Sequence, residues 1–139
     1  MRIDLFRSDH HLPSSWRATY RACMVIGSAA LFFALFCIVF EVATVPGATT
    51  LPITISVVSA LIATVHVFWE ARSATSLTLW RWAAFLGAIS VLAIEAWVTF
   101  SDPQAKQFFV TVLILGSLAL LAGRVIYAKT AIDDADAAG

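Results

Sequence analysis

Residues 22–40 read ACMVIGSAALFFALFCIVF, a run of 19 residues without a charged side chain. An α-helix over this run is about 28 Å long, close to the hydrocarbon thickness of a bilayer. The run exceeds the apolar core of a secretory signal peptide, and Glu41 follows it in place of a clear cleavage site. It therefore predicts a retained transmembrane helix.

Three further apolar runs fill most of the remaining chain, separated by the breaker-rich residues 45–50 (VPGATT) and by 101–103 (SDP). Short connections favour antiparallel neighbours. The sequence predicts an all-α integral membrane protein whose four transmembrane helices form an up-down antiparallel bundle. The whole chain, 1–139, is predicted to be a single domain with spans at about 20–41, 52–70, 79–100 and 107–127. An N-terminal arm, 1–19, precedes the spans and a C-terminal tail, 128–139, follows them. The acidic residues of the tail predict a disordered end.

Composition points to lipid as the first partner of the chain. Hydrophobic residues make up 60% of it and charged residues 13%, about half the charged share of a soluble domain. The nine basic and nine acidic residues give a formal net charge of zero, so the composition does not indicate a nucleic acid as a partner.

The distribution of Lys and Arg predicts the orientation of the bundle. Lys106 is the one basic residue assigned to the outer side, and eight flank the inner ends of the spans: Arg2, Arg7, Arg17, Arg21, Arg72, Arg81, Arg124 and Lys129. Basic residues concentrate on the cytoplasmic side, so both termini are predicted to be cytoplasmic. The compact chain and short loops suggest a bacterial inner membrane.

Small residues recur at the four-residue spacing that lets helix backbones approach in lipid. The rows are Ala30/Ala34, Ser56/Ala60/Thr64, Ala83/Gly87, Ala84/Ala88 and Ala119/Gly123. Together they favour a tight bundle over four helices separated by lipid.

Glu95 stands out as an ionisable residue inside the predicted span 79–100, roughly one and a half turns from its outer end. A charge at membrane depth is costly, so such a residue is a functional candidate by default. One interpretation is a proton-coupling or cation-binding carboxylate. The other is a glutamate that reaches the headgroups or hydrogen-bonds a neighbouring helix.

Glu41 ends the first predicted span, so it should lie near the same membrane face as Glu95 and Asp102. These three acids, opposed by Lys106, predict an acidic outer mouth that could concentrate cations or dock a basic partner. The alternative is that end-of-helix acids are simply solvated.

His66 and Glu70 are four residues apart and share one face of the second span. Three interpretations compete: a metal site, an axial ligand for haem, and a structural His–Glu pair near the inner boundary. Metal sites normally use three or four ligands, and haem with two histidines needs one that this chain lacks inside the membrane. The structural pair is favoured, and no metal or other cofactor is assigned.

The sequence contains no catalytic triad and no phosphate-binding glycine loop, so it gives no support to an enzyme. The favoured function is an accessory, assembly or scaffolding subunit of a membrane complex, or a homo-oligomer, acting by helix–helix contact. The alternative is a small proton- or cation-coupled transporter or channel that uses Glu95. A haem- or quinone-associated redox subunit that uses His66 ranks below both.

Overall fold

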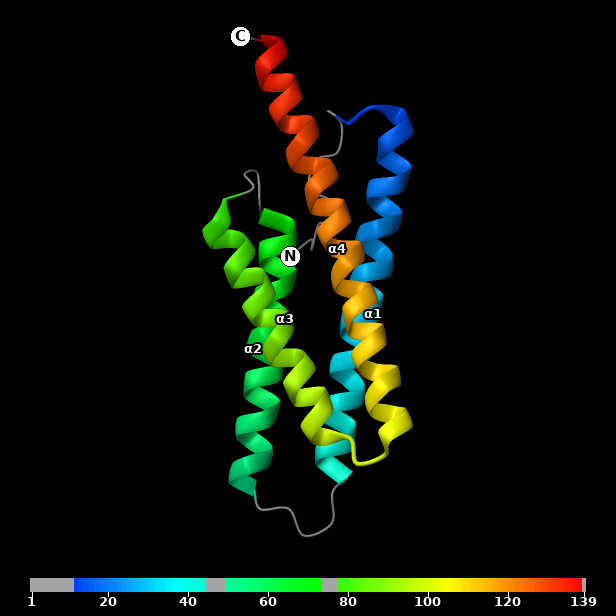
Figure 1. Ribbon diagram of the computed structural model, residues 1–139, viewed down its shortest axis with the longest axis vertical. Coiled ribbons are helices and arrows are strands. Elements are labelled where there is room, and N and C mark those ends of the chain that lie inside the picture. Colours follow the sequence, from blue (N-terminus) through cyan, green and yellow to red (C-terminus); the bar gives the residue numbers. More distant parts are fainter. Residues whose placement is uncertain (1–11, 45–49, 74–77, 139) are drawn as a thin grey trace, which may run out of the picture.

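The protein is described by a computed structural model over residues 12–44, 50–73 and 78–138. Within these ranges the chain forms four helices and no strand: α1 Ser14–Thr44, α2 Thr50–Ser73, α3 Leu79–Thr99 and α4 Pro103–Ala138. Consecutive helices run in opposite directions, and α1 begins at the end of the bundle where α4 ends (Figure 1). Each helix has an apolar stretch long enough to cross a bilayer. The predicted all-helical membrane protein with four candidate spans is thereby confirmed.

Aspartate and proline determine where α4 begins. Pro103 is its first residue, a position where the missing N–H of proline removes no helical hydrogen bond. Oδ1 of Asp102 accepts a hydrogen bond from the backbone N–H of Gln104 at 3.3 Å. Asp102 therefore caps the helix, and the predicted break at 101–103 is confirmed.

α4 continues well beyond the predicted span 107–127. It has 36 residues, about 54 Å of helix, and its last turns extend beyond the other helices (Figure 1). The prediction of a disordered acidic tail is wrong, since residues 128–138 are helical. The alanines of this segment favour helix, and extending a helix avoids the cost of nucleation. Predictions for the arm at 1–11, the turn at 45–49 and the side chain of Arg72 fall outside the described residues.

The most extensive helix contact joins α1 to α4. A Cβ atom at Gly27 would lie 2.6 Å from Cγ of Leu120 and 2.8 Å from the carbonyl oxygen of Gly116. A Cβ atom at Gly123 would lie 3.0 Å from Sδ of Met24. Glycines therefore let these two backbones approach, as small residues do between helices in lipid.

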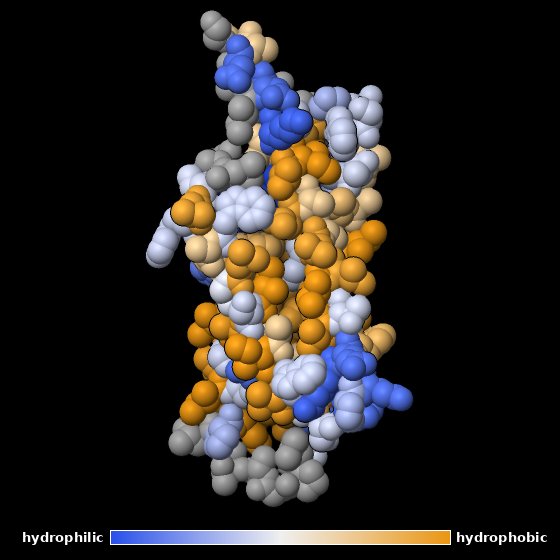
Figure 2. All heavy atoms as spheres, in the orientation of Figure 1, coloured by the Kyte–Doolittle hydropathy of each residue, from blue (hydrophilic) through white to orange (hydrophobic). Residues whose placement is uncertain are grey.

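α2 and α3 form the second close pair. Ala60 and Val67 of α2 and Phe85 and Leu92 of α3 are buried. These two helices are the least covered, since 22% and 17% of their apolar windows are buried, against 33% for α1 and α4. Apolar side chains cover the middle of the visible surface and hydrophilic ones gather mainly toward its two ends (Figure 2). The arrangement suits helices surrounded by lipid tails.

Candidate functional site

Glu95 lies on α3 and is held by two hydroxyl groups of α2. Oγ of Ser56 donates a hydrogen bond to Oε2 of Glu95, and Oγ of Ser59 donates one to Oε1 at 2.7 Å. A spacing of three residues places both serines on one face of α2. We call Ser56, Ser59 and Glu95 the serine clasp. It supplies each carboxylate oxygen with a donor from the neighbouring helix.

A shallow groove of ≈ 390 Å³ opens beside the serine clasp, between α2 and α3. Its rim is formed by Ile55, Ile94 and Val98, whose side chains are all exposed, and Glu95 and Ser56 supply its polar lining. The exposed apolar rim places the opening toward lipid. The half-buried carboxylate can thus be reached from the bilayer side.

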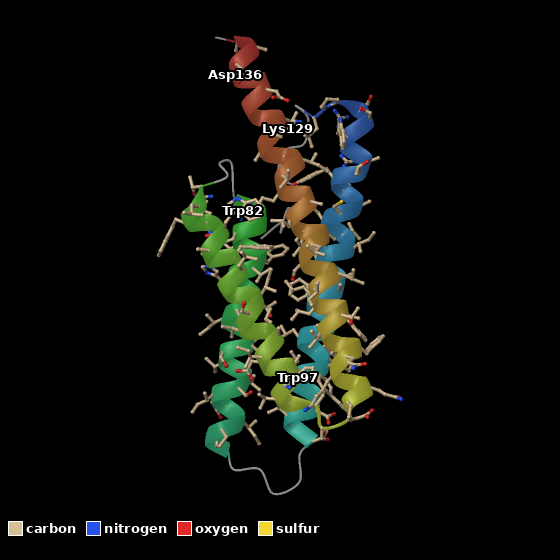
Figure 3. The ribbon with its side chains drawn as sticks, in the orientation of Figure 1. Trp82, Trp97, Lys129 and Asp136 are labelled. Carbon is tan, nitrogen blue, oxygen red and sulfur yellow. The ribbon has the colours of Figure 1, made fainter. Side chains whose placement is uncertain are left out.

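Glu41 belongs to a different groove from Glu95. Together with Asp102 it lines a recess of ≈ 290 Å³ where α1 ends and α4 begins. The predicted acidic mouth therefore has two parts, because Glu95 faces α2 in its own groove. Nζ of Lys106 lies 5.1 Å from the ring centroid of Trp97. Trp97 and Trp82 lie toward opposite ends of α3 (Figure 3).

His66 is exposed on α2, while Glu70, one turn later, is half-buried. Oε2 of Glu70 is buried without a hydrogen-bond partner, and no hydrogen bond is found between His66 and Glu70 in the described part of the chain. Across the same residues no group of three or more His, Cys, Asp or Glu side chains could hold a metal ion. A haem or quinone role for His66 stays a prediction, and absorbance of the purified protein near the haem bands would test its haem version.

Arg124, predicted to lie at the inner membrane boundary and within reach of the His66–Glu70 pair, lies inside the bundle. Its side chain is 1% exposed, and its guanidinium carbon lies 5.8 Å from the ring centroid of Trp82 and 5.9 Å from that of Phe85. Nε, Nη1 and Nη2 are all buried, and none has a hydrogen-bond partner among the described residues. The sequence carries a signal for this burial in the apolar residues four positions either side of Arg124. These are Leu120 and Ala128, and both are buried.

Two more charged side chains lie close enough to act electrostatically on Arg124: Glu70 of α2 and Arg81 of α3. Both are half-buried. Oε2 of Glu70 and one terminal nitrogen of Arg81 are buried and lack hydrogen-bond partners within the described ranges. We call Glu70, Arg81 and Arg124 the arginine cluster. It joins three helices at the end of the bundle where α1 begins.

Comparison of this chain with protein families, with curated proteins and with solved structures finds no match.

Proposed function

We propose that this chain is a non-enzymatic membrane subunit that acts by helix–helix contact. It would serve as an accessory, assembly or scaffolding component of a membrane complex, or as a homo-oligomer. The observation that carries the proposal is the position of Gly87, a glycine in a small-residue row that the bundle itself does not need.

Gly87 differs from the three glycines packed between α1 and α4. A Cβ atom there would have no neighbouring atom within 4 Å. Gly87 lies in a groove of ≈ 360 Å³ on the outer face of α2 and α3. Small side chains dominate this groove, which we call the Gly87 groove: Ser59, Ala63, Ala84, Gly87 and Ala88.

A glycine inside a helix is less favourable than alanine by about 0.5–1 kcal/mol. Gly27, Gly116 and Gly123 offset this cost with close contacts within the chain, whereas Gly87 does not. A helix from another subunit that packs into the Gly87 groove would supply the missing contact. Because α2 and α3 are also the least covered helices, this face is the best candidate for the subunit contact.

We place the bundle in a bacterial-type inner membrane with both termini in the cytoplasm. The basic residues support this orientation, since Arg17, Arg81 and Lys129 belong to the end where α1 begins and α4 ends, whereas Lys106 follows the start of α4 at the other end.

Purification from native membranes in mild detergent or polymer discs tests the proposal. Mass and partner identity are then read by mass spectrometry. We expect either a different membrane protein at fixed stoichiometry or a defined homo-oligomer. A monomer that carries no partner under these gentle conditions would contradict the proposal.

The groove beside the serine clasp favours a second candidate function, a small proton- or cation-coupled transporter or channel. Its supporting observation is a carboxylate that opens toward lipid while held by the hydroxyl groups of Ser56 and Ser59. A membrane carboxylate of this kind can bind and release a proton or cation. Among the described residues, Glu95 is the one charged group that lines this groove, which makes the transporter the second choice.

Flux in reconstituted vesicles separates the two functions. If Glu95 couples transport, Glu95→Gln abolishes flux, whereas Asp136→Asn, which neutralises an exposed acid near the end of α4, leaves it intact. Undiminished flux in the Glu95→Gln variant would remove this carboxylate from the mechanism.

A further inference from the structure

The side chain of Arg124 has buried hydrogen-bond donors that lack acceptors among the described residues. An arginine side chain has five N–H donors and no acceptor, and all three of its nitrogens are buried here without a hydrogen-bond partner in the described part of the chain. Burial inside the bundle keeps bulk water from these donors, because the side chain of Arg124 is 1% exposed. A side chain in this state is a vacant binding group unless something outside the described residues accepts its hydrogen bonds.

The neighbours of Arg124 compensate its charge only in part. The rings of Trp82 and Phe85 stand 5.8 and 5.9 Å from its guanidinium carbon, distances at which an aromatic face attracts a cation but does not satisfy its in-plane donors. Glu70 acts on Arg124 through its charge, yet its Oε2 has no hydrogen-bond partner among the described residues.

The arginine cluster as a whole is short of acceptors and carries excess positive charge. Arg81 and Arg124 contribute two cations and Glu70 one anion, so the three formal charges leave an excess of one positive charge. One terminal nitrogen of Arg81 is also buried and unpartnered within the described ranges. A ligand that completes the cluster must therefore be an anion with several acceptor oxygens.

We propose that the arginine cluster binds a phosphate group. The planar fork of Arg124 matches two phosphate oxygens, and Arg81 can contact a third. The carboxylate of Glu70 then accepts from a hydroxyl or ammonium group attached to the phosphate. The phosphate belongs either to the headgroup of an anionic lipid or to a soluble phosphate ester.

The position of the cluster fits a headgroup. Glu70 is the last residue of the candidate span of α2 and Arg81 is the third residue of α3. Trp82, whose aromatic ring suits the boundary between lipid and water, follows Arg81 on α3 and lies near the start of that helix (Figure 3). Basic pockets between transmembrane helices at this depth are suited to lipid phosphates.

Thermal unfolding of the full chain in zwitterionic detergent tests the proposal. Three probes are added separately: phosphatidylglycerol, inorganic phosphate and the zwitterionic lipid phosphatidylcholine. A ligand that binds the folded state raises the unfolding midpoint. A rise with phosphatidylglycerol alone identifies a lipid headgroup, and a rise with inorganic phosphate identifies a site for soluble phosphate. No rise beyond that given by phosphatidylcholine overturns the proposal.

Two variants separate a binding site from a structural arginine. Arg124→Met keeps an unbranched, flexible side chain, shorter by two atoms, and removes the buried charge, so without ligand it should unfold at a higher temperature than the wild type. It should also bind the effective probe roughly tenfold more weakly or worse. Lys129→Gln removes an exposed charge from the same helix and should bind like the wild type.

If Lys129→Gln weakens binding of the probe as much as Arg124→Met does, general positive charge attracts the probe, and the proposed site is overturned. If Arg124→Met does not fold, Arg81→Gln replaces it, since it removes one of the two phosphate contacts and leaves Arg124 in place. Wild-type affinity in Arg81→Gln would then contradict the proposal.

Discussion

At the scale of single residues, two hydroxyl groups of α2 and a carboxylate of α3 connect these helices. Sequence position identified Glu95 as the intramembrane acid and left open whether it would face a neighbouring helix. The two serines were not predictable as its donors, because the contact depends on how far α2 and α3 are rotated about their axes. That rotation is determined by packing around buried residues such as Ala60 and Leu92.

Removal of both hydroxyl groups of the serine clasp should destabilise the bundle. The Ser56→Ala, Ser59→Ala double variant leaves the Glu95 carboxylate without its donors, which should lower the free energy of unfolding by about 1–3 kcal/mol. Titration of the folded chain in mixed micelles with a denaturing detergent measures the change.

Ser90→Ala is the matched control for this double variant. The hydroxyl of Ser90 is exposed and donates to the carbonyl oxygen of Leu86 in its own helix at 2.8 Å, so its loss should cost less than about 0.5 kcal/mol. Equal losses in the double variant and in Ser90→Ala would show that the clasp contributes nothing to stability.

The burial of Arg124 inside the bundle was not predicted from the sequence. A basic residue near the end of an apolar run normally marks a membrane boundary, and the row from Leu120 to Ala128 was the signal that this one turns inward. Its burial also requires Trp82 and Phe85 of α3 beside it, and their approach to α4 is a tertiary contact that one sequence does not reveal.

At the scale of helices, the uncharged runs predicted the spans well because bilayer thickness imposes their length. Helix ends were less predictable, since no lipid limits a helix that continues into water, and α4 reaches Ala138. The row Ala119/Gly123 indicated packing on α4, whereas the close approach of Gly27 to Gly116 depends on which helices become neighbours.

Glycine substitutions should separate the inner and outer faces of the helices. Gly27→Ala places a Cβ atom 2.8 Å from a backbone oxygen of α4 and should destabilise the isolated chain by about 1–3 kcal/mol. Gly87→Ala meets no atom within 4 Å and should stabilise the isolated chain by up to about 1 kcal/mol. The same unfolding titration measures both, and effects of equal sign and size would contradict this assignment of faces.

At the scale of the whole molecule, the proposed orientation can be measured with single cysteines. In a background where the free Cys23 and Cys37 are replaced by alanine, cysteine is introduced at the exposed positions Asp136 or Asp102. A membrane-impermeant maleimide applied to intact spheroplasts should label Asp102→Cys and spare Asp136→Cys. Labelling of Asp136→Cys alone would reverse the orientation.

The central claim is that the Gly87 groove receives a helix from another subunit. The most direct test compares the native mass of the wild type, Gly87→Leu and Ala122→Leu after extraction in polymer discs. Ala122 is an exposed small residue on α4, so its variant introduces the same leucine side chain away from the groove. We predict that Gly87→Leu loses the partner or oligomer while Ala122→Leu keeps it. A Gly87→Leu variant that retains the complete assembly would contradict the account.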